Sequence, residues 1–274
     1  MLWRGGRQSG NIEDRRGVSL GRGIAGGGIG TVVIVLIALF LGVDPSVLLQ
    51  GGTEATTSSY DAPAPRAAPA QDDERAFVAT VLADIEDVWH RLFKTLGRTY
   101  EEPTLVLFTG AVQSACGMAQ SAVGPFYCPR DHRVYLDLGF FAELRVRLHA
   151  GGDFAEAYVI AHEVGHHVQT LLGLMRQGGA GSNAQSVRTE LQADCFAGIW
   201  AHEADRTSHI LETGDLEEAL NAAAAVGDDR LQRRSQGYVA PETFTHGSSA
   251  QRVAWFKRGF ASGNLKACDT SASP

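Results

Sequence analysis

Residues 161–169 read Ala161-His162-Glu163-Val164-Gly165-His166-His167-Val168-Gln169, and the pattern H-E-x-x-H lies within them. On an α-helix, residues four apart lie on one face, one turn apart, so His162 and His166 can direct two imidazoles at one metal ion. His167 is rotated by about 100° from His166, which makes it the poorer ligand. Glu163 follows the first His, where its carboxylate can reach a metal-bound water. This arrangement is typical of zinc hydrolases with a Glu general base.

The residues around the motif predict the helix that these ligands require. Asp153 is a suitable N-cap, and apolar residues recur at helical spacing after it. These residues are Phe154, Ala157, Tyr158, Ala161, Val164 and Val168. The alternative is a chance occurrence of the five-residue pattern on an ordinary amphipathic helix, and the pattern alone does not decide between the two.

A catalytic zinc site also needs a third protein ligand and an open position for water. An extended motif with a further Gly and His is excluded, because Gln169 and Leu172 occupy those positions. Glu190 lies 24 residues after His166, which leaves room for a loop and a returning helix. Asp194 shares a helical face with Glu190 and can accept the free N–H of a ligand imidazole. Alone, this acidic pair is more typical of a solvated helix face; together with H-E-x-x-H it predicts a site for Zn²⁺.

The chain resembles the bacterial neutral zinc metallopeptidase family, which is gluzincin-like in having H-E-x-x-H and a downstream Glu ligand. H-E-x-x-H is shared by many unrelated peptidases, so the flanking segments are the more specific part of the resemblance. It implies a zincin-like α+β fold, mainly helical with a small β-sheet and preceded by a single transmembrane helix. The similar segments are Trp3-Arg4-Gly5, Glu13-Asp14-Arg15-Arg16, 124–129, 162–169, 190–198 and 245–252.

The charge of the chain is unevenly distributed along its 274 residues. The formal net charge is −7, although residues 1–22 contain five arginines against two acidic residues. The remainder is therefore strongly acidic, which argues against nucleic acid as a partner. Protein or peptide substrates and a membrane are the partners that we expect.

An apolar stretch near the N-terminus predicts a membrane anchor. Residues 24–43 carry no charge, and about 20 such residues can span a bilayer core of roughly 30 Å. A cleaved secretory signal is the alternative, but Asp44-Pro45-Ser46 follows instead of a small-x-small cleavage site. The preceding arginines predict a cytoplasmic N-terminus and an exported C-terminal domain.

The predicted organisation has four parts. Residues 1–23 are a basic cytoplasmic segment, which we interpret as flexible, and residues 24–43 are the single-pass anchor. Residues 44–74 are rich in Ala, Pro, Gly and Ser and form a linker. Residues 75–274 are the metallopeptidase domain, on the extracytoplasmic side of the cell membrane.

Within the domain, periodicity predicts helices at 77–93, 139–149, 186–204 and 215–225, and a last helix that begins at Ser248 or Ser249. Strands are predicted at 104–109 and 133–137, with a polar loop at 113–122. The region 124–137 is our candidate for a sheet edge that binds substrate in extended form. An ordinary core hairpin is the alternative interpretation of that region.

The cysteines are Cys116, Cys128, Cys195 and Cys268, an even number that predicts two disulfides in an exported domain. Three pairings are possible. We prefer Cys116–Cys128 and Cys195–Cys268, because the first closes a short loop and the second ties the tail to the Glu190 helix. Metal ligation by these residues is the alternative, but the sequence has no C-x-x-C and the His/Glu set already completes a site.

The predicted function is hydrolysis of peptide bonds by a zinc-activated water, with Glu163 as the general base. We expect an endopeptidase rather than an exopeptidase. His246 and Tyr238 are candidate donors to the oxyanion, although His246 equally suits a structural role beside the last helix. The rival prediction is an inactive, zinc-stabilised envelope scaffold or binding protein, which would not need Glu163. A zinc hydrolase that acts on a non-peptide amide is a third possibility.

Overall fold

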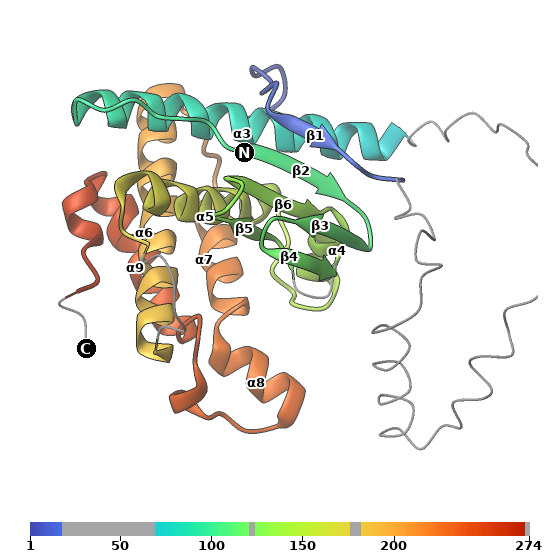
Figure 1. Cartoon of the computed structure of the whole chain (residues 1–274), viewed down its shortest axis with the longest axis vertical. Helices are drawn as coiled ribbons and strands as arrows, with labels where there is room; N and C mark the ends of the chain where they lie inside the picture. Colours follow the sequence, from blue (N-terminus) through green and yellow to red (C-terminus); the bar gives the residue numbers. More distant parts are fainter. Residues whose placement is uncertain (18–68, 121–123, 176–181, 272–274) are drawn as a thin grey trace, which may run out of the picture. The chain divides into compact units, whose positions relative to one another are not determined.

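The computed structural model describes residues 1–17, 69–120, 124–175 and 182–271 (Figure 1). The segments Met1–Arg16 and Ala67–Pro274 form one unit. Its elements are a four-stranded sheet, a separate hairpin and a larger helical part, and helix α5 (Asp153–Leu172) contacts both the sheet and other helices. The expected mainly helical α+β fold with small sheets is therefore correct.

The sheet has the strand order β1-β2-β6-β5. Strands β1 (Ile12–Asp14), β2 (Thr104–Phe108) and β6 (Arg133–Asp137) are parallel, and β5 (Phe126–Cys128) is antiparallel to β6. The polar segment predicted as a loop instead contains a hairpin of β3 (Ala111–Ser114) and β4 (Gly117–Gln120). The chain reverses at Ala115 and Cys116, so that Ser114 pairs with Gly117, whose φ is 124°.

The helices pack against the sheet and against one another. The long helix α3 (Pro69–Thr95) places Val78, Val81, Leu82, Ile85 and Trp89 in the core. This explains the apolar stripe of the sequence, because residues three and four apart share one helical face. The other helices are α4 (Gly139–Val146), α5 (Asp153–Leu172), α6 (Asn183–Ser208), α7 (Asp215–Ala225), α8 (Asp228–Gln236) and α9 (Ser249–Ser262), with 3₁₀ turns at Pro241–Thr243 and Leu265–Cys268.

Several expected boundaries differ in the structure. Helix α3 begins at Pro69, inside the predicted linker and before the predicted domain start. Helix α5 has Gly152 at its N-cap, so Asp153 is the first helical residue instead of the cap. Helix α8 was not predicted, because its sequence is almost wholly polar. The last helix begins at Ser249, and Ser248 forms a capping box with Gln251, as the sequence indicates.

The N-terminal residues were predicted to be flexible, and this is wrong for residues 1–16. Strand β1 lies at the edge of the sheet beside β2, and Met1 is buried with its amine 2.7 Å from the Asp153 carboxylate. A three-residue strand that contains Glu13 and Asp14 is too short and too polar to give a periodic signal. Only its pairing with β2 reveals it.

The four cysteines form the two disulfides that we preferred, Cys116–Cys128 and Cys195–Cys268. Disulfides of this kind are typical of an oxidising, extracytoplasmic compartment. Among the helices of the described ranges, none combines the length and the apolar character needed to cross a bilayer. The predicted anchor at 24–43 lies outside those ranges.

Candidate metal centre

The site is formed where helices α5 and α6 approach closely. Gly165 makes this approach possible, because a Cβ placed there would lie 3.0 Å from the carbonyl oxygen of Ala193. Gly165 belongs to the H-E-x-x-H stretch of α5, and Ala193 lies between Glu190 and Asp194 on α6. The contact therefore brings the two segments that carry the predicted ligands side by side.

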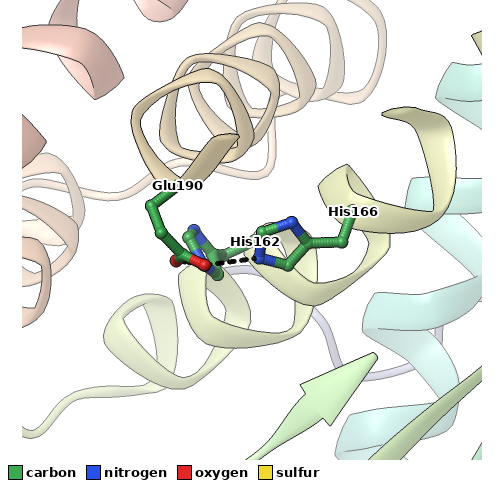
Figure 2. A group of neighbouring side chains, drawn as sticks. All are labelled: His162, His166 and Glu190. Carbon is green, nitrogen blue, oxygen red and sulfur yellow. Dashed lines mark hydrogen bonds and ion pairs between the residues drawn. The ribbon is translucent and has the colours of Figure 1, made fainter. Parts of the chain in front are cut away.

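The predicted ligands converge at this contact. Figure 2 shows the Glu190 carboxylate directed at the imidazoles of His162 and His166. Its oxygens lie 3.1 Å from Nε2 of His162 and 3.5 Å from Nε2 of His166. Two ligands of a tetrahedral zinc ion are about 3.4 Å apart when the zinc–ligand bonds are about 2.0–2.2 Å long. The two distances from Glu190 match this spacing, and the ligand atoms of all three side chains lie within 4.8 Å of one another, so the set fits a zinc ion.

The outer nitrogens of both imidazoles are held by hydrogen bonds. Nδ1 of His162 lies 2.9 Å from Oδ1 of Asp194, and Nδ1 of His166 lies 2.9 Å from Oε1 of Gln169. Because both partners are acceptors, each Nδ1 donates its proton to them, and each Nε2, which faces Glu190, is the nitrogen that would bind a metal. The Gln169 amide is itself fixed, since it donates to the Thr189 carbonyl and to Oε1 of Gln192. This is the tautomer that a metal requires.

The electrostatics of the cluster favour a cation. Burial disfavours the charged form of His162, but Asp194 and Glu190 outweigh this effect and raise its pKa to about 10. Burial likewise opposes protonation of His166, and Glu190 nevertheless raises its pKa. The pKa of Glu190 is well below its ordinary value, because the two imidazoles overcome the cost of burying its charge. A divalent cation between these groups would replace the positive charge that they attract.

Asp194 is the centre of a buried network that the sequence revealed only in part. Besides His162, it accepts hydrogen bonds from the Tyr158 hydroxyl at 2.5 Å and from Nε of Arg252 at 2.9 Å. Arg252 is only 4% exposed and also donates to the Tyr158 hydroxyl. The Arg252 charge lowers the pKa of Asp194 although burial raises it. No role was predicted for Tyr158, which falls among the apolar positions of its helix, or for Arg252, which ends the segment 245–252.

A cavity of about 430 Å³ opens beside the predicted metal ligands. Glu163 lines it together with His162, His166 and Glu190. Among the described residues, the Glu163 carboxylate has no hydrogen-bonding partner, although the residue is 8% exposed. A carboxylate in that position is available to a water molecule or a substrate. The rest of the wall is largely apolar and includes Pro125, Phe126, Phe140, Val159, Met175 and Leu231.

His246 also lines this cavity, and it has a carboxylate partner that the sequence did not indicate. Its Nδ1 lies 3.2 Å from Oδ1 of Asp228, and this hydrogen bond raises the pKa of His246. The other oxygen of Asp228 accepts hydrogen bonds from the backbone N–H groups of Thr245, His246 and Gly247. Asp228 thereby fixes both the loop and the imidazole. The 18 residues that separate Asp228 from His246 conceal the pair in the sequence.

Two other candidates lie away from the ligand cluster. His167 lies on a different face of α5 from His162 and His166, and its ring nitrogens face the Tyr127 hydroxyl and the Glu101 carbonyl. Burial lowers the pKa of His167 to about 4, so it is a neutral core residue. Tyr238 is 63% exposed and does not contribute to the cavity wall.

The segment proposed for substrate binding borders the cavity. Gly124, Pro125, Phe126 and Tyr127 are part of its wall, and β5 is the outermost strand on that side of the sheet. An outermost strand has backbone N–H and C=O groups that can pair with a further strand. The same segment also contributes to the core, since Tyr127 and Cys128 are buried. The core interpretation is therefore correct for part of this region, and substrate binding at its edge stays a prediction.

Comparison with known proteins gives one family and several relatives. The family model described as "Putative neutral zinc metallopeptidase" matches residues 1–271. The "Uncharacterized protein YpfJ" of Escherichia coli (strain K12) is 47% identical, with 98% of each chain covered. The "Uncharacterized protein Rv2575" of Mycobacterium tuberculosis (strain ATCC 25618 / H37Rv) is 43% identical and covers 85% of this chain and 84% of its own. No solved structure matches.

Proposed function

Because this chain belongs to the "Putative neutral zinc metallopeptidase" family, we propose that it is an extracytoplasmic zinc endopeptidase that hydrolyses peptide bonds. The observation that carries the proposal is the position of Glu163. It lines the cavity beside the cluster of His162, His166 and Glu190, and no other described side chain occupies its carboxylate by a hydrogen bond. A scaffold that needs zinc only for stability would gain nothing from this free carboxylate.

His162, His166 and Glu190 would hold the metal, while Asp194 and Gln169 orient the two imidazoles. When bound, zinc lowers the pKa of a coordinated water toward ~7 and polarises a carbonyl oxygen. Glu163 accepts a proton from the attacking water and then delivers it to the leaving amine. His246, held by Asp228, donates a hydrogen bond to the oxygen on which negative charge develops.

The substrate would lie in extended form along β5. Its backbone would pair with the free edge of this strand, which borders the cavity at Phe126 and Tyr127. Strand addition uses backbone groups on both sides of the scissile bond, and this favours an endopeptidase. The predicted apolar anchor at 24–43 would hold the domain at the membrane, where it would act on protein substrates of the cell envelope.

The test is Glu163→Gln in the purified full-length chain. We expect the variant to keep its zinc and its thermal stability, because Glu163 makes no hydrogen bond that the change would remove. We expect it to lose cleavage of unstructured proteins such as casein, measured by the appearance of new amino groups. Equal zinc content with no cleavage by either protein would favour the zinc-stabilised scaffold. Release of ammonia or sugar amines from peptidoglycan, without cleavage of proteins, would favour a non-peptide amide as the substrate.

A further inference from the structure

The contacts of residues 1–16 indicate which side of the membrane the N-terminus occupies. A single-pass anchor at 24–43 would place these residues in the cytoplasm and the metal site outside. The two regions would then be separated by a bilayer core of roughly 30 Å. The structure instead joins residues 1–16 to the metallopeptidase domain by backbone, polar and apolar contacts.

Strand β1 is an integral part of the sheet. Ile12, Glu13 and Asp14 pair in parallel with Leu105, Val106 and Leu107 of β2. Leu105 and Leu107 have no exposed surface in this arrangement. Parallel strands need a crossover connection, and α3 lies between β1 and β2 in the chain, so β1, α3 and β2 form a β-α-β unit. Without β1, the edge of β2 would present unpaired backbone groups and apolar side chains to solvent.

Glu86 of α3 depends on the same N-terminal residues. It is 1% exposed, and its carboxylate receives hydrogen bonds from Ser9, Asn11 and Arg7 at 2.6, 2.9 and 3.3 Å. These are all of the hydrogen bonds to this carboxylate from described residues. A buried carboxylate that loses its partners is strongly unfavourable. The sequence of α3 therefore carries a charge that only residues 1–16 satisfy.

Residues that precede and follow the segment 18–68 lie close together. Asp14 precedes residues 18–68 and Arg75 follows them, yet Oδ2 of Asp14 lies 3.8 Å from Nε of Arg75. Arg4 and Asp73 form a second ion pair across the same junction, at 3.7 Å. Trp3 packs edge-on against Phe77, with ring centroids 5.3 Å apart. The two ends of the intervening segment are therefore held together by described residues.

We propose that residues 1–16 lie on the same side of the membrane as the metal site, as a permanent part of the metallopeptidase domain. A single crossing of the membrane between residues 16 and 69, as predicted from the sequence, is incompatible with this arrangement. Because the two disulfides place the domain in an oxidising compartment, the N-terminal residues are extracytoplasmic too. This arrangement replaces the predicted cytoplasmic N-terminus. It is independent of peptidase activity.

The first test asks which side is exposed. Gly10 is exposed, and a Cβ placed there meets no atom within 4 Å, so Gly10→Cys adds an accessible thiol. Val146→Cys, at a site 70% exposed on α4, reports the side of the metallopeptidase domain. Each full-length variant is treated with a membrane-impermeant maleimide in spheroplasts, before and after permeabilisation. Equal labelling of both variants in intact spheroplasts is the expected result. Labelling of Val146→Cys before permeabilisation and of Gly10→Cys only afterwards would overturn the proposal.

The second test asks whether the contact forms in cells. A Cβ at Gly6 would lie 2.7 Å from Cγ2 of Thr80, so Gly6→Cys and Thr80→Cys together place two thiols in contact. A specific protease site inserted after Ser59 allows residues 1–59 to be cut from the rest. Neither native disulfide joins the two parts. After free thiols are blocked in intact cells, the cut chain should stay in one piece until it is reduced.

The matched control for the second test is Gly10→Cys with Thr80→Cys, which should fall into two pieces. If Gly6→Cys with Thr80→Cys also falls into two pieces in cells, the proposal is wrong. Failure of the purified protein to form this cross-link with an added oxidant would show that residues 6 and 80 are not in contact. That outcome removes the structural basis of the proposal as well.

Discussion

Nδ1 of His162 lies 2.9 Å from Oδ1 of Asp194, and this carboxylate has no exposed surface. The hydrogen bond connects a ligand of the candidate metal site to a network that the fold holds rigidly. Asp194 is bound on its other sides by Tyr158 of α5 and Arg252 of α9. The orientation of His162 is therefore set by three helices that are distant from one another in the sequence.

Asp194→Asn should weaken zinc binding by about 10–100-fold, the usual effect of losing a group that orients a ligand imidazole. The neutral amide no longer stabilises the Nδ1–H tautomer, and the Arg252 charge loses its partner. Zinc affinity is measured by competition with a chelator. Asp84→Asn is a matched control, because Asp84 is a mostly buried carboxylate that accepts a hydrogen bond from Trp200 away from the site. Unchanged zinc affinity in Asp194→Asn would refute the orienting role.

Arg252→Met should lower the free energy of unfolding by about 3–5 kcal/mol, because it leaves the buried Asp194 charge without its partner. The change is measured by urea denaturation of the metal-free protein. The double variant with Asp194→Asn should lose less than the sum of the two single losses, since the pair no longer exists to be broken. Additive losses would show that Arg252 and Asp194 are energetically independent.

The clustering of His162, His166 and Glu190 was predictable from the sequence because it follows local rules. The spacing of His162 and His166 is set by one helical turn, and Glu190 shares a face of the next helix with Asp194. Those rules fix which side chains lie on one face of a helix. They also identify the core face of α3 and the start of the last helix at Ser249.

The remaining site residues depend on how distant segments pack, and helical periodicity does not indicate their partners. Arg252 lies on α9 and reaches Asp194 only because α6 and α9 approach closely, at Gly198 and Gly259. A Cβ at Gly259 would lie 1.9 Å from the Cys195 carbonyl oxygen. Asp228 meets His246 for a similar reason, through the fold of one loop. Strand β1 was missed because its pairing partner is 93 residues away in the sequence.

Removal of Cys195–Cys268 by paired Ser substitutions should lower the free energy of unfolding by about 4 kcal/mol. The loss is large because this disulfide joins residues that are 73 positions apart in the sequence. It should also weaken zinc binding. Gln192 donates to the Cys268 carbonyl and accepts from Gln169, so the tail is connected to the group that orients His166. Stability is measured by urea denaturation and zinc affinity by chelator competition.

Cys116–Cys128 is the matched control for that experiment. Its sequence separation is 12, so its removal should cost less, about 3 kcal/mol. It lies in the β3–β5 region and contacts none of the metal ligands directly. Its loss should leave zinc affinity unchanged. Equal effects of the two removals on zinc affinity would contradict the connection through Gln192.

His246→Ala should lower kcat by about 10²–10³-fold, the typical cost of removing one oxyanion donor, while zinc content and thermal stability are retained.

Asp228→Asn tests the same role through pH. The Asp228 carboxylate raises the pKa of His246, so the imidazolium persists to a higher pH than an ordinary histidine allows. With a neutral partner, that pKa falls, and the alkaline limb of the kcat profile should move to lower pH. Two outcomes would contradict the catalytic role: a stable Asp228→Asn variant with an unshifted alkaline limb, or a His246→Ala variant with full activity. Either result would mean that the pair holds the loop before α9 and takes no part in catalysis.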